Sequence, residues 1–404
     1  MGWGWIFLTR DVILGLVPRI CRRFASRSVA DARGRPERDG RRGCRPLSDA
    51  LRYKAISHSI SRERDTMTDC KAMILGCSGL SLTADEIALY RDEQPWGFIL
   101  FGRNIGEKQQ ITDLVAAMRD AVGRPDAPVL IDQEGGRVQR IKPPILQAYP
   151  NARILGEIYE RDRSAGLRAA WLMSRLHAFD LTKFGINVDC LPVLDVPVEG
   201  ASNVIGNRAY GYTPTMVAEM GQAAADGLKA GGMLPIMKHM PGHGRGMVDS
   251  HHELPVVDVP LDELDAHDFV PFRALKHELM AMSAHLVFNA VDRERPATTS
   301  KKVIDEIIRG RIGFDGLLMS DDSSMNALKG TLGERAANIV AGGCDIVLHC
   351  NGVMGEMLEV VKEVPVLSGR SLERVRAVEA GFPAADPSDE AELRAEFNAM
   401  WAVS

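Results

Sequence analysis

The chain has 404 residues, of which 45% are hydrophobic and 25% charged, a balance typical of a globular protein with one large core. The net charge of −5 is unevenly spread, because residues 1–66 carry 15 Lys and Arg against 7 Asp and Glu and the rest is strongly acidic. An acidic body argues against nucleic-acid binding, which needs basic surface to neutralise phosphates. The seven cysteines are scattered and show no metal-ligand spacing, which favours a reduced, cytoplasmic protein.

Residues 1–66 differ in character from the remainder. Their apolar start is interrupted by Arg10 and Asp11, so it is too broken to span a bilayer and is a poor signal peptide. We expect a disordered extension or a misassigned start, with no stable membrane association; a transit-like or membrane-surface role is the alternative. The folded domain is expected over residues 67–404.

From Met67 onward the sequence alternates between short apolar runs and longer amphipathic segments. The apolar residues of each run follow one another and do not alternate with polar ones, which indicates strands of a parallel sheet that are buried on both faces. They span residues 72–77, 96–101, 128–132, 186–193, 233–239, 279–288, 316–322 and 344–350.

The segments between the runs have helical periodicity. Residues 83–93 open with Thr83 and Glu86 at the spacing of a capping box. Further helices are predicted over 107–123, 163–185, 213–232, 301–313, 333–343 and the C-terminal end. Eight strands interleaved with helices predict an α/β fold, a (β/α)8 TIM-type barrel in a single domain. A doubly wound open sheet is the alternative, although the chain has no GxGxxG or GxxxxGK[ST] loop.

Two of the apolar runs end in carboxylates, and the functional residues of such barrels gather at strand ends. In DQEGGRVQR (132–140), Asp132 can accept and Arg140 can donate hydrogen bonds to a ligand. A surface turn in which these two side chains pair with each other is the alternative.

Asp321 and Asp322 end the seventh run. Adjacent side chains of an extended segment point opposite ways. We therefore expect Asp321 to face the centre and Asp322 to support it, with a helix N-cap as the alternative.

The loop KHMPGHGRGMVDSHHELP (238–255) is the most distinctive segment. Asp249 and His251 lie two residues apart, close enough for the carboxylate to orient the imidazole for acid/base chemistry. Metal binding by the histidines is the rival interpretation, but no HExxH-like spacing is present. Lys238 beside His239 would also oppose a bound cation. Arg208, in VIGNRAYG (204–211), is by itself compatible with a solvated side chain.

Together these motifs resemble glycoside hydrolase family 3, most closely its short bacterial branch of single-domain β-N-acetylhexosaminidases of peptidoglycan recycling. The resemblance covers about residues 70–370 and rests on DQEGGRVQR, VIGNRAYG, KHMPGHGRGMVDSHHELP and MSDDSSMNAL, in that order. It implies a retaining exo-enzyme that releases terminal β-linked N-acetylglucosamine through a covalent glycosyl-enzyme.

The resemblance also implies a role for each matching residue. Asp321 would be the nucleophile, His251 the acid/base and Asp249 the group that orients His251. The residues that would bind the terminal sugar are Asp132, Arg140, Arg208, Lys238 and His239.

The resemblance implies no cofactor and no metal, and a small carbohydrate substrate of the GlcNAc-anhydroMurNAc or chitobiose type. We expect a cytoplasmic monomer. A phosphorylase on the same scaffold is the close alternative, because a neutral histidine repels incoming phosphate less than a carboxylate does. A metal-dependent barrel hydrolase is the more distant one.

Overall fold

The computed structural model describes residues 70–247 and 254–401. These residues all belong to the second of the two compact units of the chain, residues 58–404. The expectation for residues 1–66 therefore lies outside the described residues.

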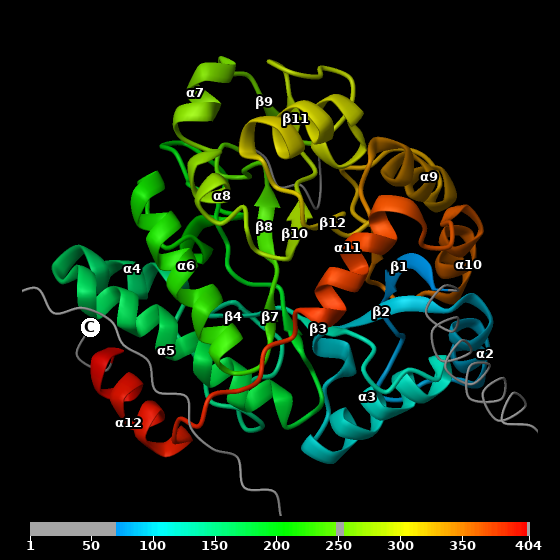
Figure 1. The fold of residues 1–404 in the computed structure, drawn as a ribbon, viewed down its shortest axis with the longest axis horizontal. Coiled ribbons are helices and arrows are strands. Elements are labelled where there is room, and N and C mark those ends of the chain that lie inside the picture. Colours follow the sequence, from blue (N-terminus) through cyan, green and yellow to red (C-terminus); the bar gives the residue numbers. More distant parts are fainter. Residues whose placement is uncertain (1–69, 248–253, 402–404) are drawn as a thin grey trace, which may run out of the picture. The chain divides into compact units, whose positions relative to one another are not determined.

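Each of the eight apolar runs contains a strand of one parallel barrel (Figure 1). The strands, in chain order, are β1 (Lys71–Leu75), β2 (Pro95–Leu100), β3 (Val129–Ile131), β6 (Val188–Asp189), β7 (Leu234–Pro235), β8 (Met237–Met240), β10 (Met280–Ser283), β12 (Leu317–Met319) and β13 (Val347–His349). Their residues are almost all buried, and β2 is buried throughout, as expected for strands covered on both faces. The fifth run forms two consecutive short strands, β7 and β8, instead of the single strand predicted.

Pairing between neighbouring strands closes the barrel. One sheet has the order β13-β1-β2-β3-β6-β7 and the other β12-β10-β8. Parallel bridges from Val193 to Lys238 and from Met319 to Ile346 join the two sheets at both edges. The predicted (β/α)8 barrel is thus confirmed, and the open-sheet alternative is wrong because these bridges leave neither sheet edge free.

Helices cover the outside of the barrel. The predicted ones are present as α2 (Ala84–Glu93), α3 (Lys108–Val122), α5 (Arg163–Thr182), α6 (Pro214–Ala230), η4 (Val303–Ile312), α9 (Leu332–Gly342) and α12 (Glu390–Trp401). The capping box of α2 forms as expected, with Glu86 N donating to Thr83 Oγ1 at 3.2 Å and Thr83 N donating to Glu86 Oε2 at 2.8 Å. The segment η4 is a π-helix.

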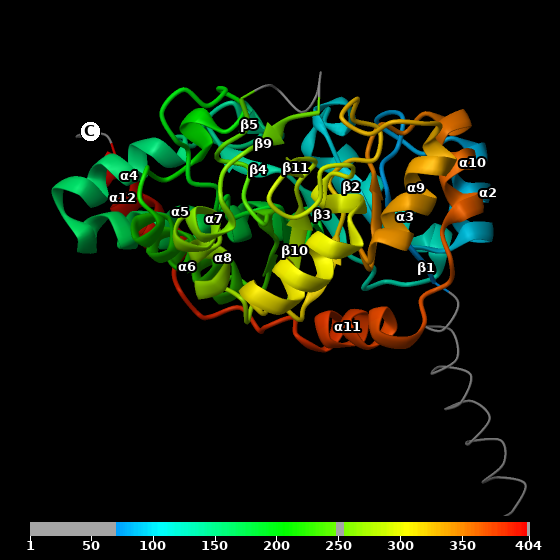
Figure 2. The same cartoon turned by 90° about the horizontal axis from the view of Figure 1, so that it is seen from above.

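Several described helices were not predicted. They are α4 (Ala152–Arg161), α7 (Leu261–Ala266), α8 (Val270–Ala274), α10 (Met354–Glu363) and α11 (Gly369–Ala380). Figure 2 shows α11 on one side of the barrel and the short strands β5 (Val138–Gln139) and β9 (Val256–Val257) on the other. The latter side carries the loops that follow the carboxyl ends of the strands. Among the described residues, none of the helices combines the length and the hydrophobicity needed to cross a bilayer.

Candidate active site

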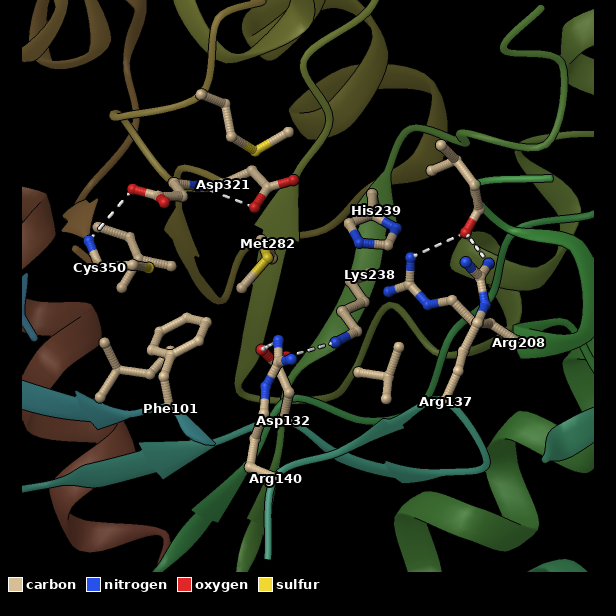
Figure 3. Close-up of a pocket in the computed structure, with 16 residues that line it drawn as sticks. Phe101, Asp132, Arg137, Arg140, Arg208, Lys238, His239, Met282, Asp321 and Cys350 are labelled. Atoms are coloured by element: carbon tan, nitrogen blue, oxygen red, sulfur yellow. Dashed lines mark hydrogen bonds and ion pairs between the residues drawn. The ribbon is translucent and has the colours of Figure 1, made fainter. Parts of the chain in front are cut away.

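A pocket of about 230 Å³ opens at the carboxyl ends of the barrel strands, the location of active sites in this fold. In Figure 3, Asp321 lies at the top of this pocket, Asp132 and Arg140 at the bottom, and Lys238 and His239 to one side. The lining residues are Ile99, Phe101, Asp132, Arg137, Val138, Arg140, Val204, Arg208, Lys238, His239, Met282, Asp321, Asp322, Met325, Leu348 and Cys350. Seven residues singled out from the sequence, Asp132, Arg140, Arg208, Lys238, His239, Asp321 and Asp322, thus meet in one cavity.

Asp132 is held by two cations at the base of the pocket. It directly follows β3, and its Oδ1 accepts from Lys238 Nζ at 2.8 Å while its Oδ2 accepts from Arg140 Nη2 at 2.8 Å. Burial alone would raise the pKa of Asp132, but Lys238 and Arg140 hold it well below its ordinary value. The pairing foreseen between Asp132 and Arg140 does occur, yet it forms a pocket wall and is not a surface turn.

A second carboxylate, Glu134, joins Lys238 to Arg208. Glu134 lies in β4 (Gln133–Gly135), and its Oε1 is 2.6 Å from Lys238 Nζ. Arg208 grips both of its oxygens, with Nε to Oε2 and Nη2 to Oε1 each at 2.8 Å. Burial would raise the pKa of Glu134, but the two cations lower it to about 2. Arg208 is therefore an anchored pocket residue and not a solvated one.

His239 is oriented by a buried carboxylate behind it. Its Nδ1 lies 2.6 Å from Asp195 Oδ2, and Asp195 is 0% exposed. Asp195 Oδ1 also accepts from the backbone N–H of His239 and, at 2.7 Å, from that of His243. With Nδ1 engaged in this way, Nε2 is the ring nitrogen available to a ligand.

Asp321 is a half-buried carboxylate on the pocket wall, and its surroundings favour the ionised form. Burial would raise its pKa, but the neighbouring His285 and His239 and the N–H of Asp322 keep it below the ordinary value. That N–H donates to Asp321 Oδ1 at 2.8 Å. His285 is fixed in turn, because its Nε2 donates to the carbonyl oxygen of Asp322 at 3.0 Å. An ionised carboxylate that faces the pocket can act as a nucleophile.

Asp322 supports the segment that carries Asp321. Its Oδ1 accepts from the N–H groups of Ser324 at 3.0 Å and Cys350 at 3.1 Å, and its Oδ2 accepts from Ser324 Oγ at 2.6 Å. These bonds tie the end of β12 to the end of β13. The supporting role expected for Asp322 matches this geometry. The expectation that only Asp321 faces the cavity is wrong, because Asp322 lines the pocket as well.

Asp249 and His251 fall in residues 248–253, outside the described residues. The segment that leads to them is well defined, because Val198 N donates to Gly244 O and Ser202 N donates to Gly246 O. Within residues 70–247 and 254–401, no three His, Cys, Asp or Glu side chains are grouped as a metal site.

Comparison with known proteins places the chain in a family. Residues 69–378 match the model of the glycosyl hydrolase family 3 N-terminal domain. The chain belongs to glycosyl hydrolase family 3. The beta-hexosaminidase of Bordetella avium (strain 197N) is 35% identical to this family 3 chain over 320 residues, which cover 78% of this chain and 89% of the relative. The beta-hexosaminidase of Chromobacterium violaceum is 39% identical over 283 residues, covering 69% and 78%.

Solved structures support the same assignment. NagZ from Neisseria gonorrhoeae, in complex with N-trifluoroacetyl-D-glucosamine, is similar to this family 3 chain with a TM-score of 0.72 and 32% identity. The similarity covers 83% of this chain and 97% of NagZ. The chain is accordingly a glycosidase of the β-N-acetylhexosaminidase type, built on a (β/α)8 barrel.

Sequence reasoning missed three residues of the family 3 site. Glu134 stands two residues after Asp132 in an extended segment, so the two carboxylates share one face, and this spacing could have identified it. Asp195, in the run LPVLDVP, had no comparable signal, because only the fold brings it to His239. Phe101 also lines the pocket, and the guanidinium groups of Arg103 and Arg140 lie 5.1 and 4.8 Å from its ring centroid.

Proposed function

We propose that this family 3 enzyme is a retaining exo-β-N-acetylhexosaminidase that releases terminal non-reducing β-linked N-acetylglucosamine. The observation that carries the proposal is the ionised, half-buried Asp321 on the wall of a pocket that also contains Asp132, Arg140, Arg208, Lys238 and His239. These side chains offer the donors and acceptors that sugar hydroxyls and an acetamido group require. The N-acylated glucosamine bound by the Neisseria gonorrhoeae NagZ supports the same sugar here.

In the proposed mechanism, Asp321 attacks the anomeric carbon while His251 donates its proton to the departing glycosidic oxygen. The aglycone leaves as an alcohol and the sugar becomes an ester of Asp321. His251, now neutral, takes a proton from water as that water attacks the anomeric carbon. The ester bond breaks, and Asp321 leaves as a carboxylate. Asp249 orients His251 and stabilises its protonated form.

Burial and ion pairing suit the wall residues to binding the terminal sugar. Lys238 has three N–H donors, and its two carboxylate contacts leave a third for a sugar hydroxyl. Asp132 and Arg140 fix each other, and Asp195 fixes His239. The sugar would therefore meet donors and acceptors that need little reorganisation on binding.

We further propose that residues 67–404 form the catalytic domain and that it acts as a monomer in the cytoplasm. The substrates would be muropeptide-derived sugars of the GlcNAc-anhydroMurNAc type or chitobiose-like disaccharides. The free, buried cysteines of the described residues (Cys70, Cys77, Cys190, Cys344 and Cys350) are in keeping with that compartment.

Hydrolysis is favoured over phosphorolysis by the charges of the pocket. Lys238, Arg140 and Arg208 are each paired with a carboxylate, so an incoming phosphate would have to compete with Asp132 and Glu134. Adding inorganic phosphate to the reaction should yield no N-acetylglucosamine 1-phosphate.

The metal-dependent alternative is tested with a chelator. A metal-dependent hydrolase would lose its activity in EDTA, whereas we expect EDTA to leave the activity of this enzyme unchanged.

Asp321→Asn tests the nucleophile. We expect kcat/KM on a chromogenic N-acetyl-β-glucosaminide to fall about 10³-fold or more, because the glycosyl-enzyme can no longer form. Mass spectrometry of the wild-type enzyme after reaction with a slow fluorinated substrate should show the label on the peptide that contains Asp321. Substantial turnover by the folded variant, or a label on another residue, would contradict the assignment.

A further inference from the structure

Glu134 lies behind the pocket wall. It is 3% exposed and does not line the cavity, whereas both of its partners, Lys238 and Arg208, do. We propose that Glu134 is a positioning residue that fixes Lys238 and Arg208 and makes the pocket select an uncharged sugar over anions. The proposal rests on the proposed function, because it takes this cavity to be the sugar-binding site.

The positioning part of the proposal follows from the contacts. Arg208 and Glu134 form a two-pronged pair, with both N–O distances at 2.8 Å, an arrangement that fixes the plane of the guanidinium. The Oε1 atom that accepts from Arg208 also contacts Lys238 Nζ at 2.6 Å. One carboxylate therefore holds two cations that come from different parts of the chain, the turn η2 (Gly206–Arg208) and β8.

The selectivity part follows from the charges. Three cations, Lys238, Arg140 and Arg208, share two carboxylates, Asp132 and Glu134. Without the charge of Glu134, Arg208 loses its carboxylate and Lys238 keeps only Asp132, which it shares with Arg140. Buried cations that lack a counter-charge attract anions strongly. Glu134 would thus act as a fixed internal anion that keeps phosphate and sugar phosphates out.

Glu134→Gln and Glu134→Asp separate these two effects. In Glu134→Gln we expect KM for a neutral N-acetyl-β-glucosaminide to rise about 10-fold, since a charge-assisted contact to each cation is lost. The inhibition constant for inorganic phosphate should fall about 10-fold with competitive kinetics. Glu134→Asp keeps the charge but withdraws the carboxyl group by one methylene. It should raise KM while leaving phosphate inhibition at the wild-type level.

Glu278→Gln is the matched control. Glu278 is 9% exposed and contacts Lys229 at 2.6 Å, and Lys229 has a second carboxylate, Asp226, at 3.0 Å. Lys229 thus lies between two carboxylates, as Lys238 does, but it is more exposed than Lys238 and its group does not line the pocket. The control should alter neither KM nor phosphate inhibition.

Thermal unfolding establishes that each variant is folded, and Glu134→Asp reports on positioning if Glu134→Gln does not fold. If folded Glu134 variants match Glu278→Gln in both KM and phosphate inhibition, the proposal is wrong. If instead the proposed function is wrong, the wild-type enzyme itself will not hydrolyse the glucosaminide. In that case, calorimetric titration of wild type and Glu134→Gln with phosphate still tests the charge effect, and equal affinities would overturn it.

Discussion

Lys238 and His239 are adjacent in the chain, yet each is fixed by its own buried carboxylate partners. Lys238 is only 1% exposed, and burial alone would lower the pKa of its ammonium group. The neighbouring carboxylates of Asp132 and Glu134 outweigh this effect and raise the pKa. His239 takes its orientation from Asp195. The positions of both side chains are thus set before any ligand arrives, which limits the ordering cost of binding.

The role of His251 can be tested through the leaving group. His251→Ala should lower kcat/KM about 10²- to 10⁴-fold on substrates with poor leaving groups, because their oxygen must be protonated as the bond breaks. The loss should be much smaller on dinitrophenyl glycosides, whose leaving group departs without a proton. Rates measured across a series of aryl glycosides give the comparison. A uniform loss across the series would rule out the acid role.

Residues 242–247 form the segment that leads directly to the proposed acid/base residues. Gly244 packs so closely on the neighbouring backbone that an added Cβ would lie 2.0 Å from Val196 O. His243 N donates to Asp195, so the same carboxylate that orients His239 also anchors this segment. The proposed sugar-binding His239 and the segment that precedes the proposed acid/base residues therefore share one support.

Gly244→Ala should consequently lower kcat about 10²-fold, because a shift of about 1 Å in a catalytic group can cost that much. Thermal unfolding and steady-state rates on a chromogenic substrate measure the effect. Gly355→Ala is the control, because an added Cβ there meets nothing within 4 Å, and its kinetics should equal those of the wild type. Unchanged kcat in folded Gly244→Ala would show that the segment does not position the acid/base.

The strand pattern was readable from the sequence because buried parallel strands are continuous apolar runs, as β2 shows with six buried residues. The helix α4 was missed because it lacks the capping box that marks the equally long α2, and a helix this short forms mainly through tertiary packing of residues such as Leu155 and Ile158. Most of the proposed site was readable too, since its motifs combine polar residues with strand ends. Asp195 was not, because its meeting with His239 exists only in the folded barrel.

Contacts at the C-terminal end extend the fold beyond the family match. The family match covers residues 69–378, and the barrel, from β1 to β13, lies within it. Beyond the match, α12 packs on α5, where Arg394 donates to Asp180 at 2.8 Å and Phe397 is 0% exposed. Asp386 accepts from the buried Arg175 at 2.7 Å. The C-terminal segment therefore belongs to the fold, although it lies outside the matched residues.

We accordingly expect a chain of residues 67–404 to fold and to hydrolyse N-acetyl-β-glucosaminides with a kcat/KM within about twofold of the full chain. The reason is that, within the described part of the chain, the first residue that lines the pocket is Ile99. A chain of residues 67–385 should unfold at least about 5 °C lower, since it uncovers the apolar face of α5 and leaves the buried Arg175 without its carboxylate. Thermal unfolding and assays of the three chains make the comparison. If the shorter start abolished activity while 67–385 remained as stable as the full chain, the proposed domain limits would be wrong at both ends.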